Sequence, residues 1–380
     1  MTVTNDPTRF TDEQLATLAT LQVKLNSLGV EGDFLPDVSV GPIVTLYRFV
    51  PKNATRVSLV ERVAPDLAIA LKVEAVQVRR VDNAVGIYVP NKTRTLVQFR
   101  DSIGPVWTAF NDKHQRIPIL FGIDHMGTFV SEDLTTLPHL LIAGATNSGK
   151  STLINSILAS LVYTIPKDRL QLVLSDVKQV EFTHFTGAPH LRYPVATDVG
   201  KTLKYLQWLI DEINNRLTTL SQRRCQNILQ HNQSSYPFMP YILLVIDELA
   251  EILMNQEREL YIDETGKERT RTLGKVAEHR LGLIAQKARA TGIHIIAATQ
   301  RPSVRVVEGN IKANFPARVS FRLPSEADSR TILGTGGAEQ LLSQGDMLYM
   351  SPNTPAIRRL HAPIASLSDI EQAIDIACRR

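Results

Sequence analysis

The sequence has few cysteines and no long apolar run. Its two cysteines, Cys225 and Cys378, form no CxxC pair, so they indicate neither a disulfide framework nor a metal site and fit a reducing compartment. The longest apolar runs, such as residues 241–246, are under half of the roughly 18 residues that a membrane-spanning helix needs. The N-terminus shows no signal peptide, because it has no basic segment followed by an apolar one. These absences predict a cytoplasmic protein without a membrane segment.

The sequence also lacks a strong excess of charge. The 42 basic and 38 acidic residues give a net charge of +4, which is compatible with a polyanionic partner but too weak to argue for one. The apolar fraction of 43% and the charged fraction of 21% are those of an ordinary soluble globular protein. The length of 380 residues suffices for two domains.

A phosphate-binding loop lies in the middle of the chain. Residues 144–151, GATNSGKS, match GxxxxGK[ST] at every fixed position, between an apolar run and a helical pattern. Backbone N–H groups of such a loop and of the following helix point at phosphates. We expect Lys150 to reach the β- and γ-phosphates and the Ser151 hydroxyl to bind Mg²⁺. The predicted nucleotide-binding residues are Gly144, Ala145, Thr146, Asn147, Ser148, Gly149, Lys150, Ser151 and Thr152.

A pair of acidic residues follows a later apolar run, YILLVIDELAEIL, at Asp247 and Glu248. A buried strand would deliver both carboxylates at its tip, where Asp247 holds Mg²⁺ and Glu248 orients or deprotonates the attacking water. The alternative is that Asp247 simply caps the next helix. The combination of this acidic pair with the phosphate loop favours a catalytic role over capping, and Glu248 next to Asp247 favours a hydrolase over a kinase.

A third strand-like run, IIAATQRPS, ends in Thr299, Gln300 and Arg301. We expect Gln300 to contact the γ-phosphate or the attacking water. The alternative is an amide that only satisfies the backbone of the following loop.

Strand-like and helical patterns alternate after residue 139. The expected strands are 139–144, 170–176, 241–247, 292–299, 317–323 and 346–350, and the expected helices are 150–162, 199–222, 272–291 and 327–342. This alternation predicts an α/β fold with a parallel sheet covered on both faces and ligands at the carboxyl ends of its strands. We divide the chain into an amphipathic helix and linker (1–34), a small α+β domain (35–120) and a motor domain (121–380), which begins with a hairpin over 121–134.

Long stretches of the chain resemble the FtsK/SpoIIIE double-stranded DNA translocases. These are LPHLLIAGATNSGKS, TDVGKTLKYLQWLIDEINNR, YILLVIDELAEIL, AQKARATGIHIIAATQRPSV and the run over 310–350, while VGPIVTLYRF and VGIYVPNK are similar to the small α domain before that motor. The resemblance covers about residues 35–365. It implies a RecA-like P-loop NTPase domain with a mostly parallel sheet, preceded by a small α+β domain. It also implies a DNA-dependent ATPase that uses ATP and Mg²⁺ and forms a homohexameric ring around double-stranded DNA.

The resemblance also assigns roles to basic residues. An arginine finger, which one subunit supplies to the nucleotide of the next, falls on Arg289, with Arg280 and Arg330 as competitors. The alternative is an arginine that stabilises a helix C-terminus. Arg301 and Arg330 match the family's DNA-contacting pore loops, and Lys312 is a further candidate. Contacts to phosphate carry no base information, so sequence-independent tracking is expected. The alternative is solvated charge or local pairing, such as Arg330 with Asp328, and Glu326 stands where many relatives carry a basic residue.

Three departures from the family remain. The chain has no membrane-spanning N-terminus, and it ends at Arg380 without room for the family's DNA-reading γ domain. Residues 255–281 form a longer segment of mixed charge, expected to be a solvated hairpin or helix rather than a brace of the ring or a DNA contact. Asp176, in an Asp-x-Lys pattern, either tunes the nucleotide site or forms a turn. The alternative functions are a conjugative or packaging motor that works with a relaxase, portal or other partner protein, and a nucleotide-gated DNA clamp, against which Glu248 argues.

Overall fold

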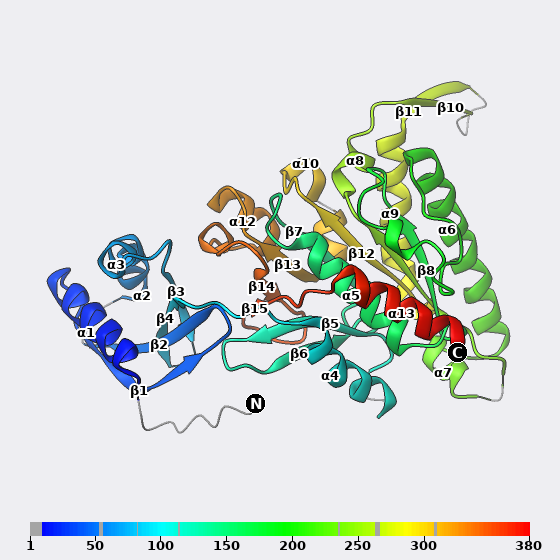
Figure 1. Cartoon of the computed structure of the whole chain (residues 1–380). Coiled ribbons are helices and arrows are strands. Elements are labelled where there is room, and N and C mark those ends of the chain that lie inside the picture. Colours follow the sequence, from blue (N-terminus) through cyan, green and yellow to red (C-terminus); the bar gives the residue numbers. More distant parts are fainter. Residues whose placement is uncertain are drawn as a thin grey trace.

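The computed structural model describes residues 10–52, 56–81, 83–112, 115–234, 236–262, 267–307 and 310–380. They form a small α+β domain and a larger α/β domain beside it (Figure 1). The small domain has an antiparallel sheet of order β1-β2-β4-β3. Its strands are β1 (Gly32–Val40), β2 (Val44–Pro51), β3 (Gln77–Val81) and β4 (Ala84–Pro90). Its helices are α1 (Asp12–Ser27), α2 (Val57–Arg62) and α3 (Ala64–Leu71).

Helix α1 packs as part of the small domain. Its Leu21 and Leu25 are buried in one core with Phe49 of β2 and Leu67 of α3. The expected linker before residue 35 is partly wrong, because β1 begins at Gly32. The proline within β1 argues against a strand, so the sequence did not predict β1. Strand β1 lies at the edge of the sheet, and its pairing with β2 is irregular between Phe34 and Val38, where the proline lies.

The larger domain is built on a nine-stranded sheet of order β6-β5-β15-β14-β13-β7-β12-β9-β8. Its strands are β5 (Pro118–Asp124), β6 (Phe129–Asp133), β7 (His139–Ala143), β8 (Leu170–Ser175), β9 (Tyr241–Ile246), β12 (Ile293–Thr299), β13 (Ala317–Phe321), β14 (Asp346–Met350) and β15 (Arg358–His361). The strands from β13 to β8 are mutually parallel, which confirms the predicted parallel sheet in this half. The predicted hairpin is the antiparallel pair β5 and β6.

The other half of the sheet departs from the prediction. Strand β14 is antiparallel to β13, so the placement of 346–350 in the parallel set was wrong. An apolar run predicts a buried strand but not its direction, so composition cannot distinguish a parallel from an antiparallel strand. Strand β15 was not predicted, because its sequence RRLH has no apolar run.

Helices cover both faces of this sheet, as predicted. One face carries α5 (Lys150–Thr164) and α13 (Leu367–Arg379), with α4 (Phe99–Asn111) and α7 (Ile228–Asn232) nearby, and the other carries α6 (Val199–Gln222), α8 (Leu249–Leu253) and α9 (Leu273–Thr291) (Figure 1). Short helices α10 (Val304–Val307), α11 (Asn310–Asn314) and α12 (Glu326–Leu333) follow β12 and β13. The helix expected over 327–342 is shorter, because Gly334 ends α12 in a left-handed conformation with φ +79°.

Helices α8 and α9 meet without free space. A Cβ on Gly274, in the first turn of α9, would lie 2.2 Å from the carbonyl oxygen of Leu253 at the end of α8. Helix α9 therefore rests directly on the helix that follows the acidic pair.

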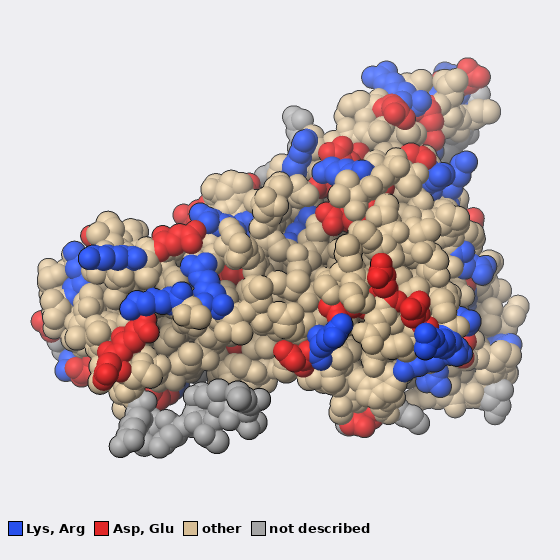
Figure 2. Space-filling view, viewed as in Figure 1, with Lys and Arg blue, Asp and Glu red and all other residues tan. Residues whose placement is uncertain are grey.

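A separate hairpin connects α8 to α9 in the sequence. It consists of β10 (Arg258–Ile262) and β11 (Glu268–Thr272), and it extends away from the body with charges of both signs on its surface (Figure 2). Leu260 and Ile262 are 72% and 71% exposed. The structure thus confirms a hairpin in the long segment after the acidic pair, and its solvated role stays a prediction against the alternatives of a ring brace or a DNA contact. No helix in the described ranges is both long and apolar enough to cross a membrane.

Candidate nucleotide site

The phosphate loop lies between β7 and α5 and is fixed to the neighbouring strands. The Gly144 N–H donates to the Thr299 carbonyl at 3.2 Å, and the Ala145 N–H donates to the Arg322 carbonyl at 3.0 Å. A Cβ on Gly149, whose φ is +114°, would lie 2.7 Å from the backbone nitrogen of Gly345. The loop can follow this path because glycine has no side chain there.

The two predicted halves of the site meet at Lys150. Its Nζ donates to Asp247 Oδ1 at 2.7 Å and to the Asp247 carbonyl at 2.9 Å, although the residues are 97 positions apart. Both side chains are 3% exposed or less. Removal of either partner would leave the other charge buried without compensation.

Glu248 is held in a fixed position beside this pair. Its Oε1 accepts a hydrogen bond from the Thr299 hydroxyl at 2.8 Å, and the Gln300 N–H donates to both carboxylate oxygens at 3.2 and 3.1 Å. The residue is 4% exposed. Sequence reasoning identified Thr299 only as the end of a strand, whereas the structure gives its hydroxyl a definite partner.

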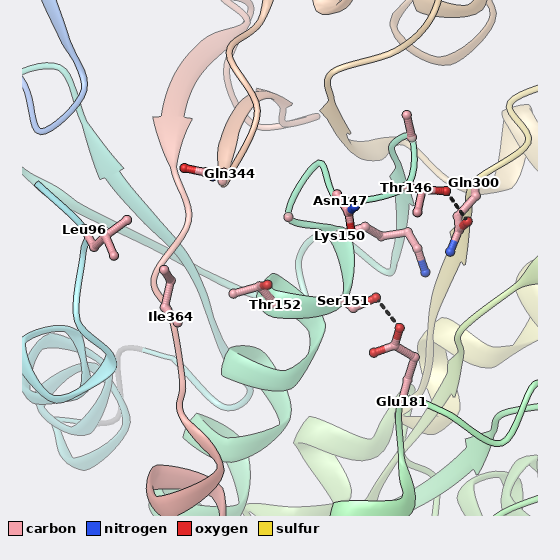
Figure 3. Close-up of a pocket in the computed structure, with 13 residues that line it drawn as sticks. Leu96, Thr146, Asn147, Lys150, Ser151, Thr152, Glu181, Gln300, Gln344 and Ile364 are labelled. Atoms are coloured by element: carbon pink, nitrogen blue, oxygen red, sulfur yellow. Dashed lines mark hydrogen bonds between the residues drawn. The ribbon is translucent and has the colours of Figure 1, made fainter. Parts of the chain in front are cut away.

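Gln300 lies on the strand between the loop strand and the acid strand. Strand β12 pairs with β7 on one side and β9 on the other. The Thr146 hydroxyl of the phosphate loop donates to Gln300 Oε1 at 3.1 Å (Figure 3). The side chain therefore contacts the loop as well as lining the cavity, as a residue near a terminal phosphate should.

Glu181 is a site residue that sequence reasoning missed. The Ser151 hydroxyl donates to Glu181 Oε1 at 2.6 Å (Figure 3). Asp176, whose role was open, accepts the backbone N–H groups of Glu181 and Phe182 at 2.9 Å each, so it shapes the turn that brings Glu181 to the site. Lys178 of the same turn lies 3.5 Å from Glu248 Oε2. The Asp-x-Lys pattern was the available signal, but it did not point to Glu181.

The oxygen donors fit a hard divalent cation. The Ser151 hydroxyl and the Asp247 carboxylate were the predicted ligands of Mg²⁺, and Glu181 adds a carboxylate in contact with Ser151. Carboxylate and hydroxyl oxygens, rather than sulfur or imidazole, are the donors that Mg²⁺ takes, usually with water and phosphate completing its shell.

A cavity of about 620 Å³ is lined by Lys150, Ser151, Glu181 and Gln300. Asp247 and Glu248 are not among its lining residues and connect to it through Lys150 and the Gln300 N–H. Figure 3 shows Lys150, Ser151, Glu181 and Gln300 at one end and Leu96 and Ile364 at the other, with Thr152 between them. One end is charged and polar, and the other is apolar.

The opposite ends of the same strands carry two buried histidines. His139 begins β7, and His294 is the second residue of β12. Burial, together with the neighbouring His294, lowers the pKa of His139 to about 3. Burial lowers the pKa of His294 to about 4, against a hydrogen bond with the Pro138 carbonyl. Both rings are therefore neutral at physiological pH.

Arg289 also belongs to this opposite edge. It is an exposed residue in the last turn of α9, just before β12 begins, and its charge contributes to the lowered pKa of His294. Since the phosphate loop lies at the other ends of the strands, the structure does not bring Arg289 to the site of its own chain. Its competitor Arg280 donates to the Leu203 carbonyl of α6 at 2.8 Å.

The basic residues proposed to contact DNA lie apart from the cavity, except that Arg301 directly follows Gln300. Lys312 Nζ donates to the Arg330 carbonyl at 3.5 Å, so these two residues are neighbours. Arg330 pairs with Glu326 at 2.6 Å, so the alternative of a local ion pair is present in this structure, with Glu326 as the partner instead of Asp328. Asp328 instead accepts the Ser325 hydroxyl at 2.7 Å within the helix cap.

The strand order, the loop and the acidic pair define the class of the chain: it is a P-loop NTPase with a RecA-like sheet. Comparison with known proteins narrows this class. The chain belongs to the FtsK/SpoIIIE family, whose model matches residues 107–238 and 228–304, and the FtsK alpha domain model matches residues 3–91. The resemblance found in the sequence is thus confirmed.

Named relatives support this assignment. The protein called DNA translocase FtsK in Helicobacter pylori is 38% identical over 359 residues, which are 93% of this chain and 40% of that protein. The protein of the same name in Rickettsia bellii is 36% identical over 383 residues, covering 92% of this chain and 48% of that one. The chain therefore spans less than half the length of these relatives.

Solved structures agree with the fold. The conjugation coupling protein TcpA of pCW3, a monomer form with ATPγS, has a TM-score of 0.64 at 21% identity and covers 96% of this chain and 100% of that one. The cytoplasmic domain of the type VII secretion ATPase EccC of Thermomonospora curvata has a TM-score of 0.56 at 23% identity and covers 70% of this chain and 31% of that one.

Proposed function

We propose that the chain is an ATP-driven motor that moves double-stranded DNA through a homohexameric ring in the cytoplasm, without strong sequence specificity. The observation that carries the proposal is the contact of Lys150 with Asp247, with Glu248 fixed by Thr299 and by the backbone of Gln300, which lines the cavity. The names of the FtsK relatives support DNA as the substrate.

The residues of the site divide the work of hydrolysis. Lys150 and the N–H groups of the loop bind the β- and γ-phosphates, and Ser151 and Asp247 hold Mg²⁺, which neutralises phosphate charge when bound. Glu248 takes the proton of the attacking water, and the Thr299 hydroxyl and the Gln300 N–H keep its carboxylate in place. Gln300, which follows β12 and accepts a hydrogen bond from Thr146 of the phosphate loop, contacts the terminal phosphate or the attacking water.

The ring completes the site. A head-to-tail interface that closes on itself brings one subunit's opposite edge to the next subunit's nucleotide. Arg289 lies at that edge, at the opposite ends of the strands from the phosphate loop of its own chain. This position supports a role in the neighbouring site.

The test is ATP hydrolysis with and without linear duplex DNA, followed by displacement of a third strand from the same duplex. A DNA pump should hydrolyse ATP much faster with duplex and should remove the third strand. An unchanged hydrolysis rate at saturating duplex and low salt would refute DNA-driven turnover. Stimulated hydrolysis without displacement would instead identify a DNA-stimulated ATPase or clamp.

Salt dependence tests the proposed DNA contacts. Each neutralised phosphate adds about −0.9 to the log–log slope of affinity against salt, so Arg330→Ala should reduce the slope by about that amount. Glu326→Gln should strengthen duplex binding, because it frees Arg330 from its ion pair. Arg258→Ala on the exposed hairpin is the control and should change neither quantity. Equal effects of Arg258 and Arg330 would contradict the assignment.

A further inference from the structure

Strand β3 of the small domain contacts the motor domain at the loop that follows α12 (Figure 1). Gln77 Nε2 donates to the Gly337 carbonyl at 2.9 Å, and Arg79 Nη2 donates to the Gly336 carbonyl at 2.9 Å. Gln77 and Arg79 are two residues apart on the strand, so their side chains lie on the same face of the sheet. One strand of the small domain therefore holds two successive carbonyl groups of the motor domain.

The loop is shaped to receive Arg79. A Cβ on Gly337, whose φ is +116°, would overlap Nη2 of Arg79. Any other residue at this position would meet both a strained backbone and the guanidinium. Glycine thus lets the arginine reach the backbone of the loop.

The same loop is tied to α12, which carries Arg330. The Ser329 hydroxyl, which is buried, donates to the Thr335 carbonyl at 2.8 Å and accepts the Ala338 N–H at 3.1 Å. Ser329 is the residue directly before Arg330 in the helix. A displacement of the loop would therefore displace the turn of helix that carries Arg330.

The end of α12 is also held from within the motor domain. Arg318 Nη1 donates to the Ile332 carbonyl at 3.1 Å, and its Nη2 donates to the Lys312 carbonyl at 2.6 Å. The Lys312 ammonium contacts the Arg330 carbonyl at 3.5 Å. The helix and its following loop are thus held by one arginine from each domain.

The two side chains of the small domain are held at this junction at a cost. Among the residues that the structure describes, Gln77 Oε1 and Arg79 Nε are buried and have no hydrogen-bond partner. Burial also lowers the pKa of the Arg79 guanidinium. Apolar side chains could fill a domain junction without these costs, so the polar pair favours a role in positioning the loop over a role in stability alone.

We propose that Gln77 and Arg79 are positioning residues for DNA binding, which hold α12 so that Arg330 reaches a phosphate of the duplex. This inference rests on the proposed function, in which Arg330 is a DNA contact. The small domain then contributes to the grip on DNA through the loop and not through a contact of its own. Arg79 and Arg330 line one cleft of about 1000 Å³ between the domains, so a direct contact of Arg79 with DNA is the outcome that the test must separate.

The experiment measures binding of a labelled linear duplex to the full chain by fluorescence anisotropy at several salt concentrations. Arg330→Ala should lower the log–log slope of affinity against salt by about 0.9, the value of one phosphate contact. Arg79→Met should lower the slope by a similar amount, because it removes the donor to the Gly336 carbonyl. The double variant should lower the slope no further, since both changes remove the same phosphate contact.

Two further variants and one control sharpen the test. Gln77→Leu removes the donor to the Gly337 carbonyl at similar side-chain volume and should also lower the slope, and it decides the question if Arg79→Met fails to fold. Arg79→Lys keeps a donor and should restore most of the slope. Arg62→Met is the matched control, because Arg62 is an exposed arginine of α2 that lines the same cleft, and it should leave the slope unchanged.

Three results would overturn the inference. The first is a wild-type slope in the folded Arg79→Met or Gln77→Leu protein. The second is a double variant that loses about twice the slope of either single variant, which would make Arg79 a DNA contact itself. The third is an equal loss in Arg62→Met, which would show a general effect of charge. Failure of the proposed function looks different, since Arg330→Ala would then leave the slope unchanged.

Discussion

The two ends of the parallel strands differ in the ionisable side chains that they bury. At the carboxyl ends, Lys150, Asp247 and Glu248 are charged side chains kept in place by short hydrogen bonds and ion pairs. At the amino ends, His139 and His294 are buried, and burial keeps their pKa values far below the usual range for histidine.

This difference shows what each edge is built for. Charges at the carboxyl edge can be buried because each has a partner and because a ligand with charges of its own is to bind there. The amino edge has no such pairing for its histidines, so they stay neutral. Its exposed charge, Arg289, is carried in the last turn of the neighbouring helix α9.

The largest effect should come from the amino edge. Arg289→Ala should lower ATP hydrolysis by roughly 10³–10⁵, the value of an arginine finger. Because the proposed finger acts on the next subunit, a mixture of variant and wild-type chains should lose more activity than the fraction of variant. Lys287→Ala, an exposed cation two residues earlier, is the control. Activity that fell only in proportion to the mixture would place Arg289 outside the neighbouring site.

A smaller effect should come from the base at the carboxyl edge. Glu248→Gln should lower single-turnover hydrolysis by roughly 10²–10⁴, while ATPγS affinity stays near the wild-type value. Glu251→Gln is the control, because Glu251 is 40% exposed and contacts Lys178 at 3.9 Å rather than Thr299 or Gln300. Hydrolysis that survived the Glu248 change would show that another group activates the water.

A still smaller effect should follow from the residue that holds this base. Thr299→Val removes the hydroxyl that donates to Glu248 at 2.8 Å and should lower kcat about tenfold with little change in KM. Thr299→Ser keeps a hydroxyl and should restore most of the rate. If the serine variant were as slow as the valine variant, packing rather than the hydrogen bond would explain the loss.

The neutral histidines give the most gradual effect, and it concerns stability instead of the rate of hydrolysis. Below pH 6.5 the unfolded chain takes up protons at His139 and His294, but the folded chain does so only near pH 3 and 4. The free energy of unfolding should therefore fall as the pH decreases from 6.5 to about 4, by at most about 1.4 kcal/mol per pH unit for each histidine.

Urea unfolding at several pH values checks this expectation. His294→Asn keeps a nitrogen that can donate to the Pro138 carbonyl but no longer titrates. The variant should show a shallower loss of stability across this window than wild-type protein. An identical slope would mean that His294 does not contribute to the acid sensitivity.

The carboxyl edge could be predicted well from the sequence, because its signals are local. The phosphate loop, Asp247-Glu248 and Gln300 each follow an apolar run, and the carboxyl ends of parallel strands converge on one edge. The structure accordingly brings Lys150, Asp247, Glu248 and Gln300 together. The roles of these residues stay predictions until they are measured.

Other features could not be read because they depend on pairing between distant segments. Glu181 reaches Ser151 only through the turn that Asp176 shapes, and Gln98 pairs with Ile364 in a bridge between segments over 260 residues apart. The direction of β14 and the existence of β15 depend on neighbours in the sheet. Helix α4 contains Gly104 and Pro105, so its local sequence argues against the helix that tertiary packing supports.

The close contact at Gly274 has a mechanical consequence. Helix α9 has 19 residues and is therefore about 28 Å long. Its first turn contacts α8, and Arg289 lies in its last turn. Because α9 contacts α8 directly, a displacement of α8 would be transmitted along this helix to Arg289 at its other end.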